Sequence, residues 1–216
     1  MHEDKIEKLI QEGYDFNMGL YIDRGMKLFS SHLGPFVGYA AIFMAINIFA
    51  GFTGIGSFAT VVVNGPLIAG FFIVTNDLVR NKIPKFDMFF QGFQIFLPLF
   101  LANLLVGIFT FVGTLLLIIP GIYLAVAYTF TIPFIIFLKY DFWDAMEASR
   151  RVITKNFWPF LGFMVVILLI NFVGILLLGI GVLFTLPATY CMIYAAFEDI
   201  VGGAVNSQGA NQQNMD

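Results

Sequence analysis

Charged side chains are scarce in this sequence, and none lies in the middle of its long apolar segments. Asp, Glu, Lys and Arg make up 12% of the 216 residues, and apolar residues make up 59%. An ordinary soluble domain has about 25% charged and about 45–50% apolar residues. An ion at the centre of a bilayer costs at least about 2.5–3.5 kcal/mol and usually marks an ion pathway, so the missing charges argue against a proton-coupled pump built from this chain alone. The composition indicates an integral membrane protein.

Cysteine and histidine are almost missing as well. The one cysteine, Cys191, lies in the last apolar segment, so there is no disulfide framework and we expect a small buried side chain. The two histidines, His2 and His32, cannot build a metal site with nearby Cys or carboxylates. The sequence also has no P-loop, nucleophile elbow or metalloprotease helix. We therefore expect no enzyme, no metal and no cofactor, and the net charge of −3 indicates no nucleic-acid partner.

Six continuous apolar runs are each long enough to cross a bilayer as a helix, which takes about 20 residues. The runs are continuous instead of alternating, and barrel strands are only about 9–11 residues long, so helices are favoured over strands. The first thirty residues are polar, without the apolar stretch of a signal peptide, so we expect the first run itself to direct insertion. The predicted fold class is all-α integral membrane with six transmembrane helices, at 33–52, 56–76, 95–118, 121–139, 157–178 and 180–198.

The positive charges predict which side of the membrane each connection faces. All eleven Lys and Arg residues lie before the first run, between the second and third, or between the fourth and fifth, and the other three connections carry no charge. Lys and Arg are retained on the cytoplasmic side. We therefore predict cytoplasmic N- and C-termini, with a cytoplasmic segment at 1–31, a membrane domain at 32–200 and a polar, disordered tail at 201–216.

An apolar phrase that occurs twice indicates an internal repeat. FVGTLLLII at 111–119 and FVGILLLGI at 172–180 agree at seven of nine positions. One set of prolines recurs near the start of the odd runs, where a missing N–H costs least, and a second set recurs inside the even runs. We predict three hairpins with the same orientation, at about 24–79, 85–140 and 141–200, related by an axis along the membrane normal. The prolines are Pro35, Pro98 and Pro159, then Pro66, Pro133 and Pro187. Pro120-Gly121 suits a type II turn that closes the middle hairpin.

Each hairpin is preceded by a segment that we expect to lie along the cytoplasmic surface, at 24–32, 85–94 and 141–158. The last has apolar residues at spacings of three or four, which is typical of an interfacial helix. Two interpretations stay open: it docks a lipid headgroup or a partner protein, or its charges and tryptophans only anchor it. The candidate contacts are Trp143, Arg150, Arg151, Lys155 and Trp158.

Polar side chains inside the runs also have two interpretations. They line a polar cavity beside helices broken by proline, or they form hydrogen bonds between helices, worth about 0.6 kcal/mol each on average. The candidate cavity residues are Asn64, Asn103, Asn171, Pro66, Pro133 and Pro187, and Thr129, Thr131, Thr185 and Thr189 add hydroxyls.

The stretch IPGIYLAVAYTFTIPFIIFLKYDFWDAMEASRRVITKNFWPFLGF, residues 119–163, resembles a widespread bacterial membrane family. The matching letters are Pro120-Gly121, Pro133, Ala145, Ser149 and Asn156-Phe157-Trp158. The family includes the membrane domain attached to some glycerophosphoryl diester phosphodiesterases, and many uncharacterised multi-pass proteins. The resemblance implies a bacterial inner-membrane protein of about six helices. The chain has no room for the phosphodiesterase barrel, so no catalytic residue is carried over.

Two functions are open on these grounds. The first is a non-enzymatic accessory, scaffold or lipid-interacting factor, with membrane lipids and a second copy or another membrane protein as partners. The second is a facilitative transporter of an apolar or amphipathic small molecule. The first predicts that Asn64, Asn103 and Asn171 contact neighbouring helices with no continuous cavity between them. The second predicts a cavity, open to one side, that these residues reach.

Overall fold

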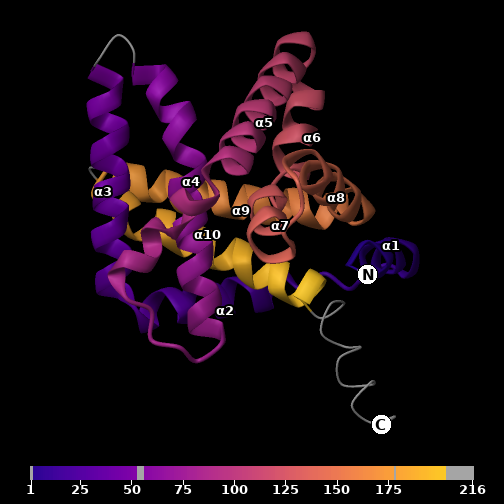
Figure 1. Cartoon of the computed structure of the whole chain (residues 1–216), viewed down its shortest axis with the longest axis horizontal. Helices are drawn as coiled ribbons and strands as arrows, with labels where there is room; N and C mark the ends of the chain where they lie inside the picture. The colour runs from indigo at the N-terminus through magenta and orange to yellow at the C-terminus, as the bar shows by residue number, and fades with distance from the viewer. Residues whose placement is uncertain (1, 53–55, 178, 203–216) are drawn as a thin grey trace.

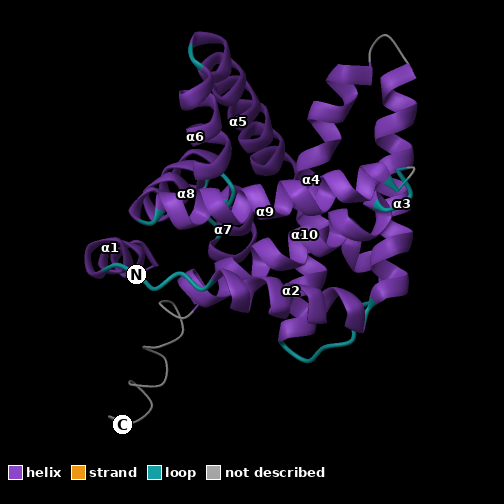
Figure 2. Cartoon of the chain, turned by 180° about the vertical axis from the view of Figure 1, so that it is seen from behind, coloured by secondary structure: helices purple, strands orange, loops and turns teal. Residues whose placement is uncertain are grey.

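The computed structural model describes residues 2–52, 56–177 and 179–202, and within these ranges every regular element is a helix (Figure 1 and Figure 2). The predicted all-helical fold is confirmed for this part of the chain. In chain order the helices are α1 (His2–Glu12), α2 (Met18–Ser31), α3 (Leu33–Phe52), α4 (Gly56–Val79), the 3-10 helix η1 (Phe86–Ile95), α5 (Phe96–Leu116), α6 (Ile118–Ala127), α7 (Thr131–Leu138), α8 (Phe142–Lys155), α9 (Phe157–Leu176), α10 (Val182–Phe197) and the π-helix η2 (Glu198–Gly202).

Within the described residues, five helical segments are long and apolar enough to cross a membrane. They are Leu33–Phe52, Thr60–Val79, Phe86–Leu116, Ile118–Leu138 and Phe157–Leu176. These segments overlap the first five predicted runs, and the third is longer than predicted because η1 continues directly into α5. The sixth run corresponds to α10, which has 16 residues, fewer than the roughly 20 that a perpendicular crossing takes. A sixth crossing stays a prediction. As expected, Cys191 in α10 is buried.

Proline marks the start of the first helix in each predicted hairpin. Pro35, Pro98 and Pro159 are each the third residue of their helix, in α3, α5 and α9. In the first turn the N–H that proline lacks has no partner within the helix, so proline costs little there. The predicted turn at Pro120-Gly121 is wrong for the same reason, since this proline also lies in the first turn of a helix. The middle hairpin turns at Leu117, which has extended backbone angles, and Pro120 is the third residue of α6.

Three helices precede the hairpins and are called the lead-in helices: α2, η1 and α8. Each packs against the second helix of a different hairpin: α2 against α10, η1 against α4, and α8 against α6 and α7. The approach is close at small residues. A Cβ added to Gly25 in α2 would lie 2.5 Å from Met192 Cα, and one added to Gly92 in η1 would overlap the Pro66 carbonyl in α4. Small side chains at these crossings thus fix the lead-in helices to the bundle.

Aromatic side chains form the core between the lead-in helices and the hairpins. The largest fully buried side chains include Tyr21, Phe36, Tyr39, Phe71, Phe72, Phe89, Phe130, Phe134, Phe160 and Phe163. Tyr39 of α3 stacks on Phe89 of η1 with ring centroids 4.4 Å apart, and its hydroxyl donates to the Leu67 carbonyl of α4 at 2.9 Å. We call this compact side of the molecule the lead-in end.

The opposite ends of the hairpins, where each one turns, expose large apolar side chains. Leu115, Leu117 and Ile119 of the middle hairpin are all more than two-thirds exposed. In Figure 1 the α3–α4 and α5–α6 hairpins extend upward, whereas α9 and α10 run across them. The prediction of three hairpins in one orientation therefore differs from this arrangement. Because the apolar runs are hydrophobic all around, the sequence does not specify which faces pack together or at what angle.

Candidate functional site

Two cavities lie one after the other along α4, α7 and α10. The first, which we call the midspan cavity, has a volume of about 410 Å³, and α5, α9 and the break between α6 and α7 complete its walls. The second, which we call the helix-end cavity, has a volume of about 440 Å³ and lies at the lead-in end of the same three helices. Ile68 and Phe72 of α4 line the midspan cavity, and Asn76 and Arg80, one and two turns further on, line the helix-end cavity.

The midspan cavity has mainly apolar walls with a few polar groups. Its polar lining residues are Asn103, Tyr128, Thr129, Thr131, Asn171, Thr189 and Tyr190. Thr131 is 2% exposed, and its hydroxyl oxygen has no hydrogen-bond partner among the described residues. A buried hydroxyl without a partner costs about 1–3 kcal/mol by protein mutational data.

Of the three candidate asparagines, two line the midspan cavity and one does not. Asn103 Nδ2 donates to the Val61 carbonyl at 3.1 Å, in the turn of α4 that precedes Pro66. Asn171 Nδ2 lies 2.7 Å from Thr189 Oγ1 of α10. Asn64 instead donates to Asn47 Oδ1 at 3.2 Å, between α4 and α3. All three contact a neighbouring helix, and Asn103 and Asn171 also reach the cavity. Asn103 and Asn171 therefore fit both sequence-based interpretations, because each forms a hydrogen bond between helices and each also lines the cavity.

The three candidate prolines lie outside the lining of both cavities. Pro66 is inside α4, Pro187 is inside α10, and Pro133 is the third residue of α7. Before Pro133, the chain leaves the helical path at residues 128–130. Ser149 of α8 pairs both backbone groups freed there: its hydroxyl donates to the Ala127 carbonyl at 2.7 Å and accepts the Phe130 N–H at 3.0 Å. This break positions Thr131 at the cavity wall.

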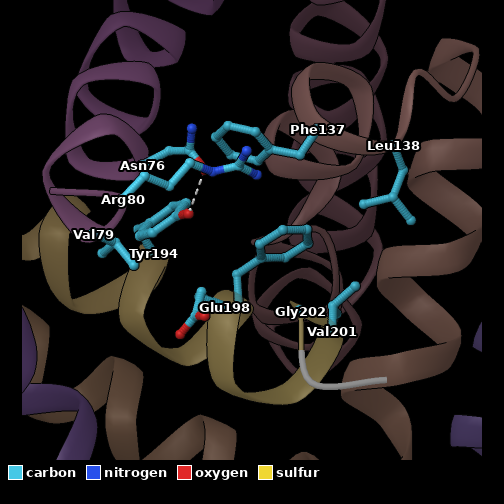
Figure 3. Close-up of a pocket in the computed structure, with 10 residues that line it drawn as sticks. Asn76, Val79, Arg80, Phe137, Leu138, Tyr194, Glu198, Val201 and Gly202 are labelled. Carbon is cyan, nitrogen blue, oxygen red and sulfur yellow. Dashed lines mark hydrogen bonds between the residues drawn. The ribbon is translucent and has the colours of Figure 1, made fainter. Parts of the chain in front are cut away.

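The helix-end cavity combines apolar walls with a hydrogen-bonded polar group. Figure 3 shows Asn76, Arg80 and Tyr194 meeting on one side of it, with Phe137 beside them and Glu198 on another side. Asn76 Oδ1 accepts two hydrogen bonds, from Arg80 Nε at 3.2 Å and from the Tyr194 hydroxyl at 2.8 Å. None of these residues was singled out from the sequence as a site. The one available signal was the position of Arg80 in the basic segment that follows the second run.

The candidate contacts on α8 divide into paired arginines and exposed side chains. Arg150 Nη2 lies 2.6 Å from Glu147 Oε1. Arg151 forms a double hydrogen bond with Glu7 of α1, and its Nη2–Oε2 distance is 2.7 Å. Trp143 and Trp158 are 55% and 77% exposed, and Lys155 is exposed. Arg151 thus contacts α1, and the two tryptophans lie on the surface. The five candidate residues do not come together in one site.

The ion pairs of α8 shift the acidity of both carboxyl partners. The Arg151 hydrogen bond lowers the pKa of Glu7, and the Arg150 hydrogen bond lowers the pKa of Glu147, against a smaller opposing effect of burial. Two further bonds hold the segment after α1 on α8. The Tyr14 hydroxyl donates to the Val152 carbonyl at 2.9 Å, and Asn156 Nδ2 donates to the Tyr14 carbonyl at 2.6 Å.

The part of the chain that the structure describes contains no group of three or more His, Cys, Asp or Glu side chains that could hold a metal ion. Comparison with known proteins finds no matching family, no matching curated protein and no matching solved structure. The resemblance of residues 119–163 to the phosphodiesterase-associated membrane domain stays a prediction.

Proposed function

We propose that this chain is a non-enzymatic, lipid-interacting protein of the cytoplasmic membrane, and that the midspan cavity holds an amphipathic lipid. The observation that carries the proposal is the midspan cavity itself, about 410 Å³ in volume, with mainly apolar walls and a few polar side chains. Ligand cavities of about 300–1,000 Å³ with mostly apolar walls and a few polar groups are typical of small-molecule sites.

The position of the cavity favours a lipid over a water-soluble ligand. Four of the five segments long enough to span a membrane contribute to its walls, through α4, α5, α7 with the break before it, and α9. A molecule that enters from the side comes from the hydrocarbon layer. An acyl chain covers the apolar walls, and an ester or carboxyl oxygen of the same lipid lies among the polar side chains of the lining.

The architecture that we propose for the membrane is six crossings in three hairpins, with both termini in the cytoplasm of a bacterial cell and the third hairpin crossing at an angle to the other two. The same order of elements occurs three times: a lead-in helix, a first helix with proline at its third residue, and a second helix with an internal proline or a break. The lead-in packing supports a closed ring: the first lead-in helix contacts the third hairpin, the second contacts the first, and the third contacts the second.

A facilitative transporter is the second candidate, because Asn103 and Asn171 reach one cavity, as that function predicts. The two functions differ in whether the bound molecule crosses the membrane. A flux assay in liposomes that hold the purified chain, with a fluorescent fatty acid as the probe, separates them. A lipid-binding factor gives binding without flux above that of empty liposomes.

The test of lipid binding is photolabelling of the full chain in nanodiscs. The probe is phosphatidylglycerol with a diazirine in one acyl chain, and labelled peptides are identified by mass spectrometry. We expect label on the peptide that contains Tyr128 and Thr131. Val106→Phe fills the cavity from α5 and is expected to reduce this label several-fold, whereas Val112→Phe, on an exposed part of α5, leaves it unchanged. Equal labelling in the two variants contradicts the proposal.

A further inference from the structure

The wall of the helix-end cavity contains a cation, Arg80, that forms no ion pair with the described part of the chain. Within those residues, no ion pair includes Arg80. The cations that line neighbouring cavities at the same end differ in this respect. Arg24 lies 3.4 Å from Glu198, Lys27 lies 2.7 Å from Asp23, and Arg151 is paired with Glu7.

Two carboxylates near Arg80 are already balanced by other cations. Glu198 lines the helix-end cavity, but its carboxylate faces Arg24 of α2 at 3.4 Å. Asp77 lies in the last turn of α4, three residues before Arg80, and Lys82 Nζ lies 3.7 Å from its Oδ1. Arg24 also lies 3.9 Å from Asp199, so the charges at this end nearly balance overall. Arg80 is nevertheless the cation in the cavity wall that has no ion-pair partner among the described residues, and such a cation attracts an anion.

The guanidinium of Arg80 is oriented for a two-point contact. Its Nε donates to Asn76 Oδ1 at 3.2 Å, and the hydroxyl of Tyr194, which is nearly fully buried, donates to the same oxygen at 2.8 Å. Asn76 Oδ1 is thus held from two sides, and it holds Arg80 in turn (Figure 3). Nη1 and Nη2 remain for a ligand. Two parallel N–H groups match the oxygens of phosphate in a bidentate geometry, which a lysine does not offer.

We propose that the helix-end cavity binds a phosphate group through Arg80, with Asn76 and Tyr194 as positioning residues. The apolar walls formed by Phe137, Leu138 and Val201 accept the organic part of a phosphate ester, since the volume of about 440 Å³ exceeds that of phosphate alone. Both a lipid headgroup and a soluble phosphate compound present this chemistry. The inference is independent of lipid binding in the midspan cavity, because the two cavities have different lining residues.

The experiment compares Arg80→Gln with Lys85→Gln in the full chain. Lys85 is an exposed cation close in sequence that does not line the cavity, which makes it the matched control. Inorganic phosphate is titrated into the detergent-purified protein by calorimetry, and retention of phosphatidylglycerol against phosphatidylcholine is measured by native mass spectrometry. Charge-assisted hydrogen bonds are worth about 1.5–3 kcal/mol, so we expect Arg80→Gln to weaken binding at least about tenfold.

The outcomes distinguish the source of the phosphate. Weaker binding of inorganic phosphate indicates a soluble ligand, and loss of phosphatidylglycerol retention alone indicates a lipid headgroup. Tyr194→Phe removes the hydroxyl that holds Asn76, so it should weaken binding less than Arg80→Gln, and Arg80→Lys should restore part of the affinity. No difference between Arg80→Gln and Lys85→Gln in either measurement overturns the proposal.

A second measurement uses the unmodified chain, so it does not depend on how a variant folds. Phenylglyoxal modifies exposed arginine, and the modified positions are mapped by mass spectrometry. Saturating phosphate or phosphatidylglycerol should slow modification of Arg80 several-fold and leave Arg24, which is paired with Glu198, unchanged. Equal protection of both arginines, or of neither, contradicts a site at Arg80.

Discussion

At the scale of single residues, small side chains decide how closely the lead-in helices approach the bundle. Gly25 faces Met192, Gly92 faces Pro66, and Ser149 pairs with the backbone on both sides of the break before α7. At Gly25 and Gly92, a larger side chain would push apart two helices whose backbones lie in close contact. The stability of the lead-in end is therefore sensitive to single methyl groups.

We expect Gly25→Ala to destabilise the protein by about 1–3 kcal/mol, because the new methyl group overlaps Met192 in a closely packed crossing. Gly107→Ala is the matched control, since a Cβ at Gly107 meets no atom within 4 Å. It should be neutral, or stabilising by up to about 1 kcal/mol. Reversible unfolding in mixed detergent micelles measures both. Equal effects of the two substitutions would show that α2 does not pack on α10 as described.

We expect Ser149→Ala to cost about 1–3 kcal/mol, because it leaves the Ala127 carbonyl and the Phe130 N–H buried without a partner. Ser31→Ala removes a hydroxyl that bonds only within its own helix on the surface, and it should change the stability by less than about 0.5 kcal/mol. The midpoint of thermal unfolding in detergent separates the two variants. A fall of the same size in both contradicts a role of Ser149 at the break.

At the scale of elements, the polar helix α1 is attached to α8 by a small set of bonds. Arg151 pairs with Glu7, and Tyr14 bonds to Val152. The pKa of Glu7 is lowered in the folded state, so the pair contributes stability above the ordinary glutamate pKa of about 4.3 and loses it as the pH falls through the lowered value. Acid should therefore loosen α1.

Spin labels on Glu12→Cys and Trp143→Cys, in a Cys191→Ala background, report the attachment of α1 as a distance distribution. We expect a narrow distribution at pH 7 that broadens in acid, as the pH falls through the lowered pKa of Glu7. Arg151→Gln should broaden it already at pH 7, whereas Lys8→Gln, a change at an exposed cation of α1 whose partner Glu12 is already replaced by the label, should not. A distribution that is independent of both pH and Arg151 is the contrary result.

The sequence predicted elements better than it predicted sites. Apolar runs and early prolines located α3, α4, α5 and α9 well, because hydrophobic length and proline position act locally. The α2 start was missed: Asn17 Oδ1 accepts the Leu20 N–H at 3.0 Å and begins the helix six residues before the predicted segment. Asn103 and Asn171 stood out as polar letters in apolar runs. The grouping around Arg80 did not, because it depends on how α4, α7 and α10 are brought together.

At the scale of the whole molecule, the charge pattern and the hairpins make a prediction about sidedness. Leu117 is exposed where the middle hairpin turns, and Ile180 is exposed where the last one turns. Lys139 and Lys155 are exposed at the opposite, lead-in end. Because lysine and arginine gather at the lead-in end, that end should face the cytoplasm.

Single cysteines in a Cys191→Ala background test this arrangement with an impermeant thiol reagent on intact cells. We expect Leu117→Cys and Ile180→Cys to react at once, and Lys139→Cys and Lys155→Cys to react only after the cells are opened. The Ile180 result also tests whether α9 crosses the membrane. Labelling of Leu117→Cys and Lys139→Cys in intact cells would refute the proposed topology.

The contact between α2 and α10 has a consequence for biosynthesis. Tyr21 of α2 donates to Asp199, which follows α10, so one of the first helices to leave the ribosome completes its packing only with one of the last. At about 5–20 residues per second, α2 waits on the order of ten seconds or more without its partner. Tyr21 and Phe29 are buried in the finished protein, so during that interval they need to be covered by the bilayer surface or by a chaperone. A ribosome that stalls before α10 leaves α2 without the helix on which it packs.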